Sequence, residues 1–74
     1  MNMRDLRKQS GKKVEEIALA LGVGSSTVRF WEQGRHEPRL PISQVQSLLD
    51  IYDCSLEDIA QATKESQKLF SAKT

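Results

Sequence analysis

The feature that most constrains the fold of this chain is an apolar helical stripe that ends at a glycine. Four apolar residues take the spacing i, i+3, i+4 and i+7 that marks one buried face of a helix: Val14, Ile17, Ala18 and Leu21. Gly22 follows directly and can adopt the left-handed conformation that stops a helix. A further helix is expected from Ser25 to Gln33, with Ser25 or Gly24 as its N-cap and Gly34 at its end. The sequence therefore predicts two short helices joined by a tight turn.

Three more helices are expected, and no strand-like alternation lasts long enough to predict a sheet. The first precedes the pair: Asn2 and Asp5 resemble a capping box before a helix over residues 3–9, which ends near Gly11. After the pair, residues 35–41 are expected to form a loop, because their polar residues and two prolines disfavour a continued helix.

A fourth and a fifth helix are expected after this loop. Ser43 with Gln46 suggests a capping box for the fourth helix, and Ser55 is expected to cap the fifth. The residues expected to face the core are Val45, Leu48, Leu49 and Tyr52 in the fourth helix and Leu56, Ile59, Ala60 and Thr63 in the fifth.

A chain of 74 residues has room for one domain. Because the sequence is polar from residue 64 onward, apart from Leu69 and Phe70, we expect a domain over residues 1–63 and a frayed or disordered tail over residues 64–74. No apolar run approaches the roughly 20 residues of a membrane span. The first residues lack the apolar stretch of a secretion signal, and Cys54 is the single cysteine. These observations predict a cytoplasmic protein that has no membrane partner.

The charges are distributed unevenly along the chain. Residues 1–40 carry eight Lys or Arg against five Asp or Glu, whereas residues 41–74 carry three against five. The N-terminal half is therefore the candidate anion-binding face, with ordinary scatter of solvated charge as the alternative.

Four short motifs are spread over most of the chain: Leu6-Arg7, Glu15-Glu16-Ile17-Ala18, Trp31-Glu32-Gln33-Gly34 and Cys54-Ser55-Leu56-Glu57-Asp58-Ile59. Together with the glycine turn, they resemble the Cro and phage-repressor type of helix-turn-helix domain, the XRE family, from about Met3 to Ile59. The resemblance implies an all-α fold, a compact five-helix bundle of the lambda-repressor-like type whose third helix enters the DNA major groove. It also implies a structural ion pair between Arg7 and Glu32 that ties the first helix to the third.

The third helix carries most of the residues expected to contact DNA. Projected at about 100° per residue, its apolar Val28 and Trp31 face one side and its polar residues face the other. The candidate base-reading residues are Ser25, Ser26, Arg29 and Phe30. Arg29 can bond guanine bidentately, and Phe30 can meet a thymine methyl group. The candidate phosphate contacts are Lys12, Lys13, Thr27, Gln33 and Arg35.

These residues favour sequence-specific binding of double-stranded DNA by a transcription regulator. A homodimer is expected, because one small domain buries little surface on DNA, and Tyr52, the fifth helix and the tail are its expected contacts. The alternative is a protein-interaction module, such as an antitoxin or adaptor, whose protein partner binds exposed apolar residues. Those residues are Phe30, Leu19, Leu69 and Phe70. A regulatory appendage of an enzyme is a third class, which applies only if the chain is a fragment.

No catalytic residue, metal site or cofactor is expected. His36 is not accompanied by cysteines or carboxylates at the spacing of metal ligands, so a solvated loop histidine is the simpler interpretation. The sequence also lacks a nucleophile with an adjacent base and a phosphate-binding glycine loop.

Overall fold

The computed structural model describes residues 1–72, and within this range the chain forms five α-helices and no strand. The helices are α1 (Met3–Ser10), α2 (Val14–Leu21), α3 (Ser25–Gln33), α4 (Ile42–Tyr52) and α5 (Leu56–Ala72). The all-α class and the five helices expected from the sequence are confirmed. The part of the expected tail that falls on residues 73–74 lies outside the described residues.

Helices α1 and α5 both begin at reciprocal capping boxes. Asn2 Oδ1 accepts the backbone N–H of Asp5 at 2.9 Å, and the Asp5 carboxylate accepts the backbone N–H of Asn2 at 3.2 Å. At α5, Ser55 Oγ accepts the N–H of Asp58 at 3.1 Å, and the Asp58 carboxylate accepts the N–H of Ser55 at 3.2 Å. Each box satisfies N–H groups that the first turn of a helix leaves without a partner. The expected caps at Asn2 and Ser55 are confirmed.

The expected capping box at Ser43 and Gln46 was wrong. Helix α4 has Pro41 as its N-cap and no side-chain cap. Because Pro41 is extended (ψ 152°) and α4 starts at Ile42, Ser43 already lies inside the first turn and cannot act as the N-cap. Gln46 Nε2 instead donates to the Asp50 carboxylate at 3.1 Å, one turn further along the same helix.

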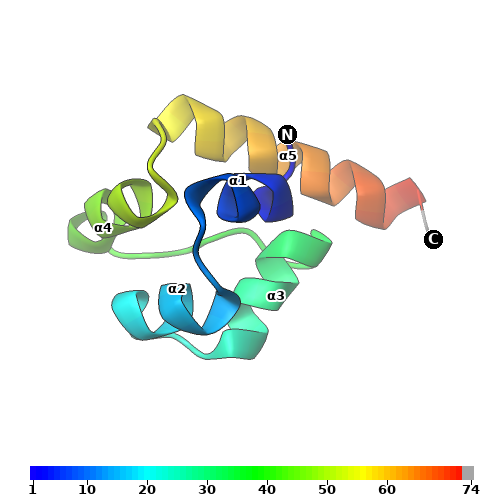
Figure 1. Ribbon diagram of the computed structural model, residues 1–74. Helices are drawn as coiled ribbons and strands as arrows, with labels where there is room; N and C mark the ends of the chain where they lie inside the picture. The colour runs from blue at the N-terminus through cyan, green and yellow to red at the C-terminus, as the bar shows by residue number, and fades with distance from the viewer. Residues whose placement is uncertain (73–74) are drawn as a thin grey trace.

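The five helices pack around one core. Helix α1 contacts α3, α4 and α5, and α2 contacts α3 and α4. In Figure 1, α5 lies across the upper side of the molecule, α2 and α3 lie on the lower side, and α1 lies between them in this view. All five helices contribute buried apolar side chains: Met3, Leu6, Val14, Ile17, Ala18, Leu21, Val28, Trp31, Leu48, Tyr52, Ile59 and Ala62.

The buried face of α5 differs from the one expected. It consists of four residues at the spacing i, i+3, i+4 and i+7: Ile59, Ala62, Thr63 and Ser66. Leu56 and Ala60, which were expected to face inward, are exposed. Leu56 occupies the first turn of α5, at the edge of the core, and Ala60 lies off the stripe.

Residues 64–72 continue helix α5, whereas the sequence analysis expected a frayed or disordered tail there. Ser66 is fully buried, and its hydroxyl accepts the backbone N–H of Met3 at 3.0 Å. Thr63 Oγ1 also reaches Met3, donating to its sulfur at 3.7 Å. A buried N–H at a helix start needs a hydrogen-bond partner, and α5 supplies it. The polarity of Ser66 therefore does not exclude this segment from the folded unit.

Gly34 allows α3 and α5 to approach each other closely. It ends α3 with φ at +79°, and a Cβ atom placed there would lie 2.1 Å from the carbonyl oxygen of Ser66. Gly22 ends α2 with φ at +69°, but nothing lies within 4 Å of a Cβ atom at that position. In both turns the residue after the glycine donates its backbone N–H to a carbonyl five residues earlier. The two glycines therefore share a conformation and differ in the space around them.

We expect Gly34→Ala to destabilise the protein more than Gly22→Ala. Both alanines would occupy the left-handed region, at a cost of about 1 kcal/mol. Gly34→Ala would also force the α5 backbone away, which adds about 1–3 kcal/mol of overpacking. Urea unfolding, followed by the fluorescence of Trp31, measures both free energies of unfolding. Equal losses for the two variants would contradict the close approach of α3 and α5.

Candidate nucleic-acid interface

Helices α2 and α3 form a helix-turn-helix around Gly22. The backbone N–H of Val23 donates to the Ala18 carbonyl at 3.0 Å and closes the turn. From α4, the side-chain amide of Gln44 donates to the Leu21 carbonyl at 3.2 Å. This bond satisfies a carbonyl that the end of α2 would otherwise leave without a partner. The turn is thus held by a bond to α2 and by a bond from α4. It determines the orientation of α3 relative to the other helices.

The outward side of α3 carries the four base-reading candidates. Ser26 and Arg29 are exposed, whereas Ser25 and Phe30 are partly buried. The opposite side of α3 is buried through Val28 and Trp31, as the helical projection predicts. Through Ser26, Arg29 and Gln33, this outward side is accessible to a large ligand.

Arg29 makes an ion pair across the helix-turn-helix. Its Nη2 lies 2.9 Å from Oε2 of Glu15, which stands in the first turn of α2. Both side chains are more than half exposed, so this pair contributes little to stability. It leaves other N–H groups of the guanidinium available. The contact between Glu15 and Arg29 was not expected, because no helical spacing relates two residues on different helices.

Arg7 and Glu32, which the resemblance paired, meet in the structure. Arg7 Nε donates to Glu32 Oε2 at 2.6 Å and Nη2 donates to Oε1 at 3.2 Å, a two-bond geometry typical of strong guanidinium–carboxylate pairs. The side chains are only 17% and 9% exposed. The hydrogen bond to Glu32 raises the pKa of Arg7 above its usual value, despite partial burial. Arg7 Nη1 also donates to the Lys12 carbonyl at 3.3 Å, so one guanidinium joins α1, α3 and the segment before α2.

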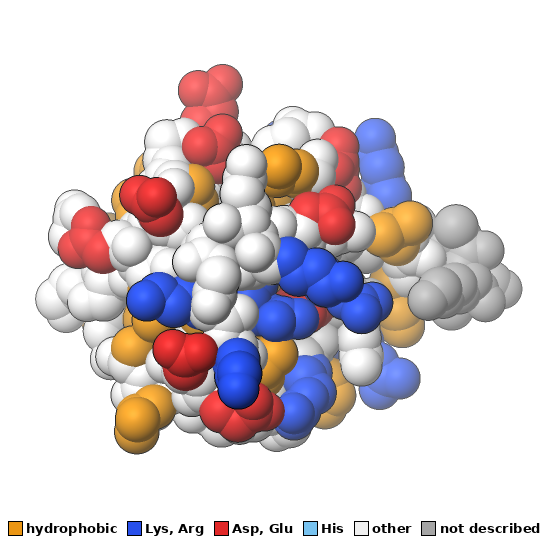
Figure 2. All heavy atoms as spheres, viewed as in Figure 1, with side chains coloured by type: hydrophobic (Ala, Val, Ile, Leu, Met, Phe, Trp, Pro, Cys, Tyr) orange, Lys and Arg blue, Asp and Glu red, His pale blue; other side chains and the backbone are white. Residues whose placement is uncertain are grey.

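The candidate phosphate contacts surround α3. Lys12, Lys13, Gln33 and Arg35 are exposed, and Thr27 is partly buried. On the face drawn in Figure 2, most Lys and Arg side chains lie across the middle and the lower right, and most Asp and Glu side chains lie above or to the left. On this face the basic side chains therefore lie together.

A groove on the molecule brings four helices together. Residues of α1, α2, α3 and the end of α5 line it together with residues that flank these helices, and the lining includes Arg4, Arg29, Gln33, Arg35, Leu69 and Phe70. Arg4 was not among the site residues expected from the sequence. Leu69 and Phe70 were assigned to a tail and to the alternative function. The structure instead places them beside residues that were expected to contact DNA.

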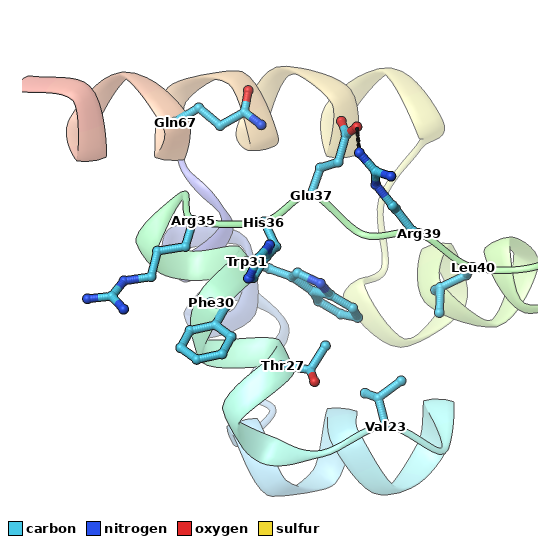
Figure 3. A pocket seen from close by; sticks show the side chains of 10 residues that line it. All are labelled: Val23, Thr27, Phe30, Trp31, Arg35, His36, Glu37, Arg39, Leu40 and Gln67. Carbon is cyan, nitrogen blue, oxygen red and sulfur yellow. Dashed lines mark ion pairs between the residues drawn. The ribbon is translucent and has the colours of Figure 1, made fainter.

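Arg35 lies beside aromatic rings rather than a carboxylate. Its guanidinium carbon is 5.7 Å from the ring centre of Phe30 and 5.9 Å from that of Phe70. The His36 ring packs against Phe30 edge to face, with 5.4 Å between ring centres. Figure 3 shows Phe30 and Arg35 at the end of α3, beside a pocket that His36 and Trp31 also line. No carboxylate lies within ion-pair distance of Arg35 among residues 1–72.

Tyr52 is buried in the core, with 2% of its surface exposed. Its expected role as a dimer contact is therefore wrong for this folded state. Burial raises the pKa of Tyr52 well above its usual value, and the nearby Glu32 carboxylate adds to the rise. Its hydroxyl has no hydrogen-bond partner within the described part of the chain. Tyr52 thus lies neutral in the core near the Arg7–Glu32 pair.

Residues 1–72 contain no group of three or more His, Cys, Asp or Glu side chains that could hold a metal ion. None of the helices described is long and apolar enough to cross a membrane.

The comparison with family models identifies the class of protein. The model of a helix-turn-helix domain matches residues 2–62, which is most of the chain. The chain therefore belongs to this helix-turn-helix family, and the match is consistent with the XRE-like resemblance. No curated protein and no solved structure matches the chain. Membership of the family suggests DNA binding.

We expect Glu32→Ala to lower the free energy of unfolding by about 1–4 kcal/mol, because it leaves the partly buried Arg7 without its carboxylate. Glu37→Ala is the matched control. Glu37 faces Arg39 at 3.8 Å on the surface, and both side chains are more than half exposed. Its removal should cost less than about 1 kcal/mol. Thermal and urea unfolding measure both variants, and an unchanged midpoint for Glu32→Ala would refute a stabilising role of the pair.

Proposed function

We propose that this protein binds double-stranded DNA in a sequence-specific manner as a transcription regulator, with α3 in the major groove. The observation that carries the proposal is the outward side of α3, where Ser26 and Arg29 are exposed on a helix that α2, α5 and Arg7 hold in place. We propose no enzymatic activity for it.

The dimensions of α3 suit this role. It has nine residues, so it is about 13 Å long. The major groove of B-DNA is about 12 Å wide and admits one α-helix. Arg29 reaches furthest of the base-reading candidates, and its remaining N–H groups can bond O6 and N7 of guanine. Ser25 and Ser26 are short, so their contribution to base reading is weaker.

The surrounding cations suit contacts with the DNA backbone. Lys12 and Lys13 precede α2, and Gln33 and Arg35 lie at the end of α3 and just after it. A helix inserted in the major groove is flanked by phosphate strands, which exposed side chains beside the helix can reach. Thr27 lies one turn before Trp31 and is the least accessible of the phosphate candidates.

A homodimer on DNA forms part of the proposal. The molecule measures 32 × 24 × 23 Å. Half-sites one helical turn apart are separated by about 34 Å, so two copies of this size would lie side by side. Sedimentation of the protein with a DNA containing two half-sites measures this directly. A single bound copy at saturation would exclude the dimer and leave the assignment of α3 intact.

The alternative function, a protein-interaction module, can be distinguished from DNA binding. Leu19 of α2 is 85% exposed, which favours an apolar partner more than it favours DNA. Binding through phosphate contacts weakens steeply as salt rises, whereas binding of an apolar partner does not. A flat salt dependence of duplex binding would therefore favour the alternative.

We expect Arg29→Ala and Arg35→Ala to weaken DNA binding in different ways. Arg29→Ala should weaken binding to a duplex selected from a random pool by about 1–3 kcal/mol and change binding to a scrambled duplex much less. Arg35→Ala should weaken both duplexes by similar factors and lower the slope of log K against log salt by about one. Salt titrations of both duplexes with each variant provide the measurement.

Lys64→Ala is the charge-matched control, since Lys64 is exposed on α5 and does not border the groove beside α3. It should leave the salt slope nearly unchanged. If Arg29→Ala instead weakened both duplexes equally, Arg29 would be a phosphate contact. Ser25, Ser26 and Phe30 would then be the remaining candidates for base reading.

A further inference from the structure

The end of α5 reaches the recognition helix. Ser66 fits against Gly34 at the end of α3, where only a glycine leaves room. Phe70 lies four residues after Ser66, so it projects from the same side of α5 one turn further on. Its ring centre lies 5.9 Å from the guanidinium carbon of Arg35, the residue that follows Gly34. The contact that positions α5 on α3 therefore also positions Phe70 beside Arg35.

The contact with Phe70 leaves Arg35 free to bind an anion. An aromatic ring attracts the positive charge of the guanidinium without accepting hydrogen bonds from its N–H groups. A carboxylate partner would accept those hydrogen bonds. Arg7, Arg29 and Arg39 each have a carboxylate partner in the structure. Arg35 has two aromatic neighbours and, within residues 1–72, no carboxylate at ion-pair distance. It is thus held in place while its donors remain available to a phosphate.

We propose that Phe70 is a positioning residue for DNA binding, which holds Arg35 where it contacts a backbone phosphate. The proposal rests on the proposed function, but Phe70 lies outside residues 2–62, which match the family model. The last turns of α5 are then part of the DNA-binding surface rather than a tail. Phe70 acts through Arg35 and does not itself read a base.

The test compares Phe70→Leu with Phe70→Tyr. Leucine keeps an apolar side chain but removes the ring, and tyrosine keeps the ring. Phe70→Leu should weaken binding to both the selected and the scrambled duplex by about two- to fivefold, and Phe70→Tyr should restore it. Leu56→Ala, at the exposed start of α5, is the control for loss of apolar surface and should not change the affinity. Melting temperatures should stay within about 4 °C of wild type, because the substituted side chains are exposed.

A double-mutant cycle separates positioning from a general effect. In an Arg35→Ala background, Phe70→Leu should no longer change the affinity, because its effect passes through Arg35. In the free protein, the side-chain proton resonances of Arg35 should lose the part of their ring-current shift that Phe70 contributes in Phe70→Leu and keep it in Phe70→Tyr, with Phe30 contributing the rest in both variants. An equal loss of affinity in both backgrounds would overturn the proposal, as would no loss in either. If the wild-type protein bound neither duplex, the proposed function would fail as well, while the resonance shift would still report the Phe70–Arg35 contact.

Discussion

Helices α1, α3 and α5 meet at Ser66, and the placement of the candidate DNA-binding side depends on that meeting. The Ser66 backbone fits against Gly34, and its hydroxyl accepts the buried N–H of Met3. One residue thereby satisfies the start of α1 and sets the distance between α5 and the end of α3. Neither contact tolerates a small change, because an unsatisfied buried N–H costs about 1–3 kcal/mol and an added methyl group at Gly34 would overlap the backbone.

A second set of contacts fixes the helix-turn-helix from α1 and α4. Arg7 bonds Glu32 of α3 and the carbonyl of Lys12 before α2, and Gln44 bonds the end of α2. Arg7 thus joins α3 to the segment before α2, and Gln44 joins the end of α2 to α4. Since the base-reading and phosphate candidates lie on these same segments, their spacing is set by the interior and not by the flexible side chains themselves. A site built on rigid elements in this way is suited to recognising a rigid duplex.

The helices were predictable from the sequence because their signals are local. The apolar period before Gly22 and the caps at Asn2 and Ser55 each depend on residues within two turns of one another. Ser66 gave no such signal, since it is a polar residue whose burial depends on Met3, 63 positions away. The extent of α5 was missed for that reason.

The candidate DNA-binding site was predictable to a similar degree: its local features could be predicted, and its long-range contacts could not. The side of α3 that faces outward follows from its period. The resemblance implied the partner of Arg7, but the partners of Arg29 and Arg35 could not be derived, because these contacts join different elements. Arg29 meets Glu15 across the turn, and Arg35 meets Phe70 from the far end of the chain. The three arginines Arg7, Arg29 and Arg35 look alike in sequence, but a buried carboxylate, an exposed carboxylate and an aromatic ring give them different roles.

The central claim is that the outward side of α3 is the surface that meets DNA. Titration of the isotopically labelled protein with a duplex selected from a random pool, followed by backbone amide chemical shifts, tests it most directly. The account predicts the largest changes in residues 25–33, smaller changes at residues 12, 13 and 35, and little change in α4. Changes concentrated in α4 and the first turns of α5, with α3 unaffected, would contradict it.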